Sequence, residues 1–172
     1  MGCPQGQDWA PAGEYTVPHE PMHIRPAQES DRDLLLEMAE RLQEGVAPWR
    51  DTGDVRRAVV DWVREALSNL ADPDGVVFVA ERDGEVVGFV GVSERSHFTG
   101  EVDTYIGELV VAKVAEGSGI GRALVGAAED WGRTRGRKRV VVDTGAANAP
   151  ARQFYAALGY EEEDVTISRA IG

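Results

Sequence analysis

Cysteine is nearly absent from this chain: 172 residues contain one, Cys3. A single cysteine can form neither a disulfide within the chain nor a thiolate metal cluster, so the sequence predicts a protein of the reducing cytoplasm. Histidine, another common metal ligand, is also scarce. The three histidines, His19, His23 and His97, do not have the spacing of metal ligands, and no metal is expected.

The chain also lacks a long apolar run and an excess of basic residues. No segment reaches membrane-spanning length and no signal-peptide core is present, so no membrane partner is expected. Lysine and arginine number 18 against 30 acidic residues, a net charge of −12. This balance argues against a dedicated nucleic-acid binder, whose contact surface is basic. An acidic surface favours solubility, and it also suits a cationic acceptor such as an amine.

What is present indicates one mixed α/β domain. Residues 1–21 are rich in proline and glycine and predict a flexible extension, followed by a domain over residues 22–172. Apolar periodicity and turn residues predict the order β-α-α-β-β-β-α-β-α-β around one central sheet flanked by helices. The expected strands are residues 22–26, 76–81, 85–92, 102–111, 139–143 and 165–171, and the expected helices begin near residues 30, 55, 120 and 149.

The most informative segment is residues 108–122, ELVVAKVAEGSGIGR. A β-branched run leads through a short connector to Gly117, Gly119 and Gly121, and an apolar helical pattern follows at once. Glycines allow a backbone to approach a ligand closely, and the first N–H groups of a helix are free and lie at its positive end. The segment therefore predicts a phosphate-binding turn.

Spacing separates the known kinds of phosphate turn. A P-loop requires Gly-Lys followed by Ser or Thr, whereas Arg122 and Ala123 follow Gly121. A Rossmann turn requires G-x-G-x-x-G, but counting from Gly117 the third glycine position holds Arg122. Asp143, at the end of the next predicted strand, would suit a ribose in a Rossmann or a methyltransferase-like site, so these nucleotide-binding alternatives stay open.

Two blocks together resemble the GNAT superfamily of N-acetyltransferases. The first is Glu116-Gly-Ser-Gly-Ile-Gly121, similar to the family pattern Gln/Arg-x-x-Gly-x-Gly/Ala. The second runs from Asn148 through Phe154-Tyr155 to Leu158-Gly-Tyr160, with a strand between the blocks. The resemblance implies an acetyl-CoA-dependent transfer to a primary amine of a small molecule or peptide. A non-catalytic acyl-CoA sensor or assembly module is the alternative.

The resemblance also assigns roles. Glu108 would be the catalytic base, although a strand-edge carboxylate paired with an arginine is the alternative. Tyr155 would assist the leaving thiolate, unless it is only a core aromatic residue. Asn148 would contact the cofactor, cap the helix, or do both. The implied acetyl-CoA-binding residues are Leu109, Val110, Val111, Glu116, Gly117, Ser118, Gly119, Ile120, Gly121, Arg122, Asn148, Arg152 and Tyr155.

Position 116 departs from the family pattern, since a carboxylate beside a pyrophosphate is repulsive. Lys113 or Arg122 could restore positive charge. For the acceptor, the expected residues are Trp49, Asp51, Asp103 and His97. Strand alternation predicts that Asp103 faces the opposite side from Glu108. Similar proteins are often dimers, so a homodimer is compatible with the resemblance.

Overall fold

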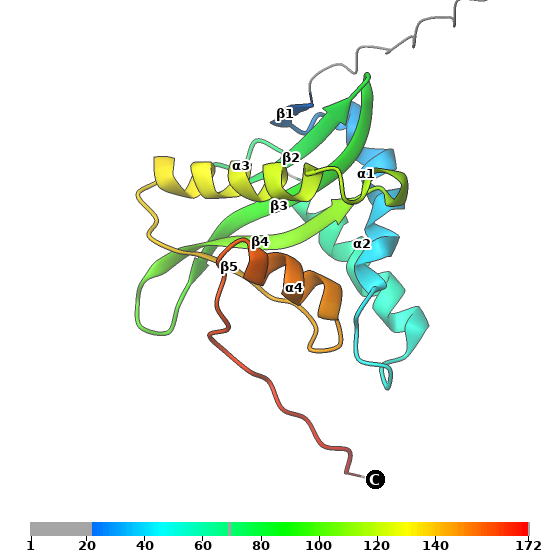
Figure 1. Cartoon of the computed structure of the whole chain (residues 1–172), viewed down its shortest axis with the longest axis vertical. Helices are drawn as coiled ribbons and strands as arrows, with labels where there is room; N and C mark the ends of the chain where they lie inside the picture. The colour runs from blue at the N-terminus through cyan, green and yellow to red at the C-terminus, as the bar shows by residue number, and fades with distance from the viewer. Residues whose placement is uncertain (1–21, 69, 172) are drawn as a thin grey trace, which may run out of the picture.

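A computed structural model describes residues 22–68 and 70–171, so the predicted extension over residues 1–21 lies outside the described residues. The described chain forms a five-stranded sheet in the order β1-β2-β3-β4-β5 (Figure 1). All neighbours are antiparallel except β4 and β5, which are parallel. The elements are β1 (His23–Pro26), η1 (Glu29–Asp31), α1 (Arg32–Met38), η2 (Ala39–Gln43), α2 (Thr52–Ala66), β2 (Gly75–Arg82), β3 (Glu85–Ser96), β4 (Val102–Val111), η3 (Lys113–Ala115), α3 (Ile120–Thr134), β5 (Val140–Val142) and α4 (Ala149–Ala157).

Helices cover both faces of the sheet, which explains why the central strands are apolar at successive positions. α3 packs on one face, where Leu124 and Val90 belong to the same buried cluster, whereas α1 and α2 pack on the other, with Val63 against Phe89 (Figure 1). Val90 and Phe89 are neighbours on β3 and point to opposite faces, as strand geometry requires. The mixed α/β architecture predicted from the sequence is confirmed.

The hairpin between β2 and β3 turns through an Asp-Gly pair, which is a favoured loop for tight hairpins. Arg82 pairs with Glu85, which leaves Asp83 and Gly84 as a two-residue loop. Both loop residues have positive φ, 53° and 77°. That is the backbone of a type I′ turn, which matches the right-handed twist of the strands it joins.

β4 and β5 separate beyond a short paired region, and this opening shapes the site. They pair only from Thr104 to Ile106 in the described chain. The β3–β4 register and the bond from the Ala112 N–H to the Val87 carbonyl, 2.8 Å, place the peptide groups of Leu109 and Val111 away from β3. The second half of β4 therefore presents the Leu109 peptide group and the Val111 N–H to an extended ligand, whereas the Val111 carbonyl accepts from Arg41.

The predicted last strand, residues 165–171, is wrong. Residues 161–171 have no regular secondary structure, and Figure 1 shows this segment running away from the sheet. Val165 and Ile167 are 75% and 90% exposed. The alternating pattern suits a strand, but a strand is stable only with a hydrogen-bonding neighbour, and none of the five described strands pairs with this segment.

Candidate active site

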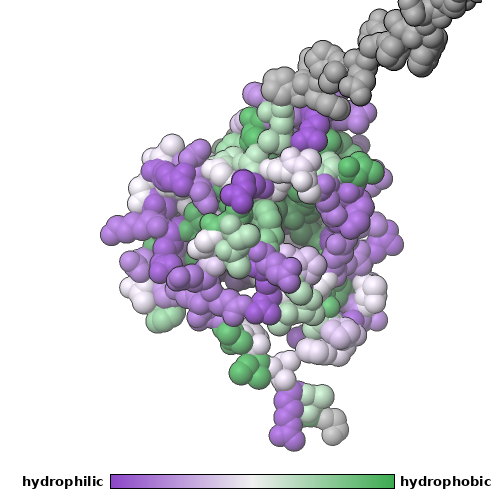
Figure 2. All heavy atoms as spheres, viewed as in Figure 1, coloured by the Kyte–Doolittle hydropathy of each residue, from purple (hydrophilic) through white to green (hydrophobic). Residues whose placement is uncertain are grey.

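A cavity of about 1420 Å³ lies at the opening between β4 and β5. On the face shown in Figure 2, hydrophobic surface lies in a hollow surrounded by hydrophilic side chains. The predicted site residues that line the cavity are Glu108, Leu109, Val110, Val111, Glu116, Gly117, Gly119, Ile120, Gly121, Arg122, Asn148 and Tyr155. The structure thus brings together two sequence blocks that lie about 40 residues apart, as expected for one binding site.

The glycine turn forms the end of the cavity next to α3. Gly117 and Gly119 have φ of 73° and 85°, a left-handed conformation that other residues rarely adopt. α3 begins at Ile120, and its first internal bond runs from the Ala123 N–H to the Gly119 carbonyl, 3.1 Å. The N–H groups of Ile120, Gly121 and Arg122 therefore have no helical acceptor, which makes this turn suitable for an anion.

Two other residues of the turn have structural roles. The Ser118 hydroxyl donates to the Ala115 carbonyl at 2.5 Å, which keeps its side chain out of the cavity lining. A Cβ at Gly121 would lie 3.2 Å from the Phe154 ring, so the missing side chain lets α4 pack closely against the start of α3. The glycines thus serve both the bend and the packing around it.

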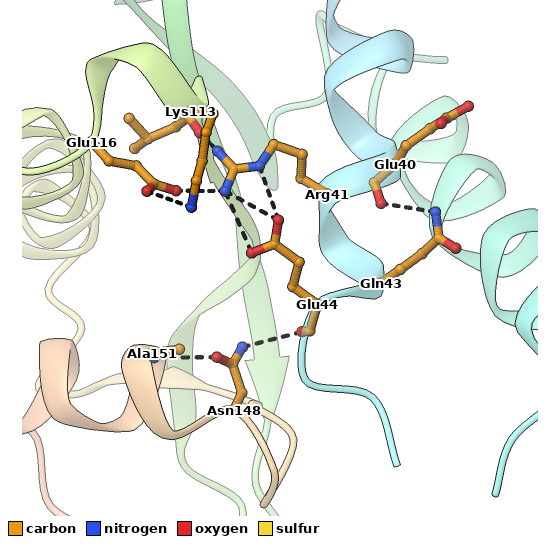
Figure 3. Close-up of polar contacts among 9 residues, drawn as sticks. Glu40, Arg41, Gln43, Glu44, Lys113, Glu116, Asn148 and Ala151 are labelled. Carbon is orange, nitrogen blue, oxygen red and sulfur yellow. Dashed lines mark hydrogen bonds and ion pairs between the residues drawn. The ribbon is translucent and has the colours of Figure 1, made fainter. Parts of the chain in front are cut away.

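Glu116 makes two ion pairs, although 43% of its side chain is exposed. Its carboxylate contacts Arg41 at 2.5 Å and Lys113 at 2.9 Å (Figure 3). Hydrogen bonds from Arg41, and then from Lys113, lower the pKa of Glu116. Lys113 is one of the compensating charges expected from the sequence, whereas Arg41 was not expected, because residues 41 and 116 are far apart in the chain and no local pattern links them.

Glu108 lies where β3 has no side chain. It stands opposite Gly91, and a Cβ at Gly91 would overlap the Glu108 carboxylate. Burial, and secondly the negative charge of Glu65 on α2, raise the pKa of Glu108. A carboxylate with a raised pKa is a stronger base, which suits proton removal from an amine.

The predicted orientation of Glu108 relative to the rest of β4 needs correction. Val92 pairs with Ile106 while Gly91 pairs with Glu108, so Gly107 is an extra residue, a β-bulge. The bulge reverses the alternation, and Tyr105 lines the same cavity as Glu108. The expectation that Asp103 and its neighbours of the same parity face away from Glu108 is therefore wrong, because simple alternation does not cross a bulge.

Tyr155 is 8% exposed and lies between the rings of Phe154 and Tyr160, with centroids 5.1 and 5.4 Å away. Burial raises its pKa well above that of a free phenol. A thiol is more acidic than such a phenol, so the hydroxyl suits hydrogen bonding to a leaving thiolate better than full proton donation. Its position at the cavity wall is compatible with that role and with core packing at once.

Asn148 joins the two sides of the cavity mouth. Its side-chain oxygen accepts from the Ala151 N–H at 3.2 Å, which confirms the predicted helix cap. Its amide donates to the Glu44 carbonyl at 3.3 Å (Figure 3). Gly145 and Gly45 also meet here, since a Cβ at Gly145 would overlap the Gly45 carbonyl. The end of η2 and the loop before α4 therefore touch across the opening.

Five predicted residues lie elsewhere. Arg152 pairs with Glu162, and Trp49 is 69% exposed. The Asp51 side chain caps α2 by accepting from the Asp54 N–H, and His97 contacts Thr99 in a loop. None of these lines the large cavity, nor does Asp103. A sequence pattern cannot separate a capping carboxylate from a substrate-binding one, because both lie just outside regular elements.

Residues of α2 and of the turn after it line the cavity although the sequence analysis did not single them out. They are Trp62, Glu65 and Asp72, and Tyr105 of β4 lines the same cavity. Trp62 is 56% exposed although it follows the apolar stripe of its helix. No signal in the sequence indicates this role, because the helical pattern places Trp62 on the apolar face and the exposure of its ring is known only from the structure.

Among residues 22–68 and 70–171, no cluster of three or more histidine, cysteine or acidic side chains is placed to hold a metal ion. No helix in the same part of the chain is long and apolar enough to cross a membrane.

The comparisons with known proteins agree with this geometry. Residues 35–160 match the model of the acetyltransferase (GNAT) family. An uncharacterized N-acetyltransferase of Archaeoglobus fulgidus is 35% identical over 137 residues, 78% of this chain and 90% of that protein. An aminoglycoside N(6')-acetyltransferase type 1 of Stenotrophomonas maltophilia is 35% identical over 109 residues, 60% of this chain and 71% of that protein.

The same fold occurs in the solved aminoglycoside N-acetyltransferase AAC(6')-Iy in complex with CoA. The TM-score is 0.67 at 22% identity, over 94% of this chain and 99% of that chain. The family match extends over well more than half of the 172 residues, and it contains both the glycine turn and the Phe154-Tyr155 block. The chain therefore belongs to the GNAT family of N-acetyltransferases.

Proposed function

We propose that this chain transfers the acetyl group of acetyl-CoA to a primary amine of a small cationic molecule, by direct attack of the amine on the thioester. One observation carries the proposal: a single cavity contains an open β4 edge, a phosphate-binding turn and a base-like carboxylate. The CoA complex of the structurally similar acetyltransferase supports the choice of donor.

The donor would bind along β4. The Leu109 peptide group and the Val111 N–H match the amides of the pantetheine arm, and the N–H groups of residues 120–122 match the pyrophosphate. An N–H of β4 could polarise the thioester carbonyl, but the peptide group of Val110 is directed toward Phe89 on β3. The N–H of Val111 faces the opening and is the better candidate for this donor.

Glu108 would remove the proton that the attacking amine must lose. An alkylammonium group has a pKa of about 10.4, so most of the acceptor is protonated at neutral pH. The nitrogen forms a bond to the carbonyl carbon, the carbon–sulfur bond breaks, and the amine proton passes to Glu108, directly or through water. The Tyr155 hydroxyl stabilises the departing sulfur by a hydrogen bond until it is protonated.

The acceptor end favours a cation. Glu65, Asp72 and Glu108 bring three carboxylates to this part of the cavity, and the exposed ring of Trp62 can stack on an ammonium group. The sequence relative that acts on aminoglycosides, which carry several amines, supports the same class of substrate. A small polyamine-like molecule is therefore proposed over a peptide.

The test is acetyl-dependent release of the CoA thiol with a panel of aminoglycosides, linear diamines and lysine-containing peptides. We expect turnover with multiply charged small amines and much less with peptides. Calorimetry with acetyl-CoA, NAD and S-adenosylmethionine provides the donor control, and binding of acetyl-CoA alone is expected. Binding of acetyl-CoA with no turnover of any amine would contradict the acceptor class and leave the donor site in place.

Replacing Tyr155 by phenylalanine should lower kcat by about 10- to 100-fold with little change in KM, because one hydrogen bond to a charged sulfur is lost. Steady-state kinetics at saturating acetyl-CoA measures the effect. Tyr160→Phe is the matched control, since its ring packs on Tyr155 but its hydroxyl points to Glu129 and not into the cavity. Equal losses in both variants would show that the aromatic packing, and not the Tyr155 hydroxyl, matters.

A further inference from the structure

Arg41 joins three parts of the molecule that are distant in sequence. Its guanidinium group donates to the Val111 carbonyl at the end of β4, to the Glu44 carboxylate on its own segment, and to Glu116 in the glycine turn (Figure 3). The side chain is only 23% exposed although it comes from the short helix η2. A long cation in this position is held by specific contacts rather than by general surface solvation.

These contacts of Arg41 lie in the wall of the large cavity. Arg41, Val111 and Glu116 all line it, together with Gly117 and Gly119. The Val111 carbonyl belongs to the open edge of β4, and Glu116 is the residue that enters the phosphate turn. Arg41 therefore stands at the junction of the edge and the turn, where the pantetheine arm of a bound donor would meet its pyrophosphate.

The charges at this junction explain how Glu116 is tolerated. Three cations, Arg41, Lys113 and Arg122, line or adjoin the turn, against two carboxylates, Glu44 and Glu116. The local balance is then one positive charge before any donor binds. The repulsion between a carboxylate in this turn and a pyrophosphate is offset by neighbouring cations, and Glu116 is paired with two of them.

We propose that Arg41 is a pyrophosphate-binding residue for the acetyl donor, and that Glu116 holds its guanidinium group at the turn until the donor arrives. The pyrophosphate oxygens then take the N–H groups that face Glu116, in the two-pronged geometry that a guanidinium group offers to phosphates. This inference rests on the proposed function for the identity of the donor. It adds to the cations near the turn, Lys113 and Arg122, a residue 75 positions before Glu116 in the chain.

The test compares two donors in the variant Arg41→Met. S-acetylpantetheine keeps the thioester and the amide arm of acetyl-CoA but has no phosphate. We expect kcat/KM for acetyl-CoA to fall by about 10- to 100-fold, and that for S-acetylpantetheine to change by less than about threefold. The affinity for acetyl-CoA in the wild type should also weaken with added salt more steeply than in the variant.

Arg56→Met is the matched control. Arg56 also comes from the N-terminal helices and pairs with a glutamate, Glu40, but it is 61% exposed and outside the cavity lining, so neither donor should be affected. Arg41→Lys keeps the charge and should recover part of the acetyl-CoA activity. Equal losses with both donors in Arg41→Met would overturn the proposal and assign Arg41 a purely structural role at Val111, and an unchanged acetyl-CoA constant would overturn it as well.

Binding measurements separate failure of this inference from failure of the proposed function. Calorimetry with CoA and with pantetheine needs no acceptor and no turnover. If the wild type binds CoA without acetylating any amine, the ratio of the two affinities in Arg41→Met still decides the role of Arg41. If the wild type binds neither compound, the donor assignment and the role of Arg41 fall together.

Discussion

Replacing Glu108 by glutamine is expected to lower kcat by about 10²- to 10⁴-fold and to leave the affinity for acetyl-CoA nearly unchanged. Glutamine keeps the shape that fits over Gly91 but cannot accept the amine proton. Steady-state kinetics and donor calorimetry on the same preparation separate the two effects. Glu101→Gln is a suitable control, because that carboxylate adjoins β4 outside the large cavity.

The pH dependence of kcat tests the role of Glu108 more specifically than the loss of kcat in Glu108→Gln. Burial, followed by the charge of Glu65, raises the pKa of Glu108, and a base works only in its ionised form. The wild-type rate should therefore fall as the pH drops through this raised pKa, and Glu108→Gln should lack that limb. Glu65→Gln should move the limb to lower pH. A limb that persists in Glu108→Gln would contradict the assignment of Glu108 as the base.

The same raised pKa predicts an effect on stability. The folded state holds the Glu108 proton more tightly than the unfolded state, so ionisation favours unfolding as the pH rises from the unfolded pKa to the folded one. Glu108→Gln should therefore have a higher melting temperature than the wild type at about pH 8 and nearly the same one at about pH 3. Thermal unfolding followed by circular dichroism measures the difference, and a variant that is less stable at the higher pH would contradict the buried charge.

The local features of this site could be predicted from the sequence, and the long-range ones could not. Gly117 and Gly119 indicate a turn in the sequence, because the tolerance of glycine for positive φ is a steric property of the residue itself. Asn148 likewise caps the helix that follows it directly. Arg41 gives no such signal, since it contacts Glu116 only after the whole sheet has formed.

Two errors have the same physical origin in pairing between distant segments. Residues 165–171 alternate like a strand, yet no described strand pairs with them. The bulge at Gly107 is defined by the partner strand. Gly91 and Val92 are consecutive on β3, but their partners Glu108 and Ile106 are separated by Gly107 on β4. A pattern within one segment reports its propensity, whereas register and pairing depend on a neighbour that the pattern does not contain.

Gly91→Ala is expected to lower kcat by about 10- to 100-fold although residue 91 carries no functional group. The added Cβ would overlap the Glu108 carboxylate, so the side chain must leave its position facing the acceptor end of the cavity. A displacement of about 1 Å at a catalytic group is enough for such a loss. Acetyl-CoA affinity should change little, because Gly91 pairs with Glu108, whereas the end of β4 that leads to the glycine turn pairs with Gly88.

A double-mutant cycle shows whether Gly91 acts through Glu108. If it does, Gly91→Ala should cost little more in a protein that already carries Glu108→Gln, because the carboxylate it displaces is already gone. Gly126→Ala is the control for a new methyl group, since it lies within α3 and a Cβ there meets nothing within 4 Å. Additive losses in the double variant would refute the coupling and point to a distortion of β3. The expected non-additivity would instead establish that a glycine opposite the base is what allows β4 to present a carboxylate at this cavity.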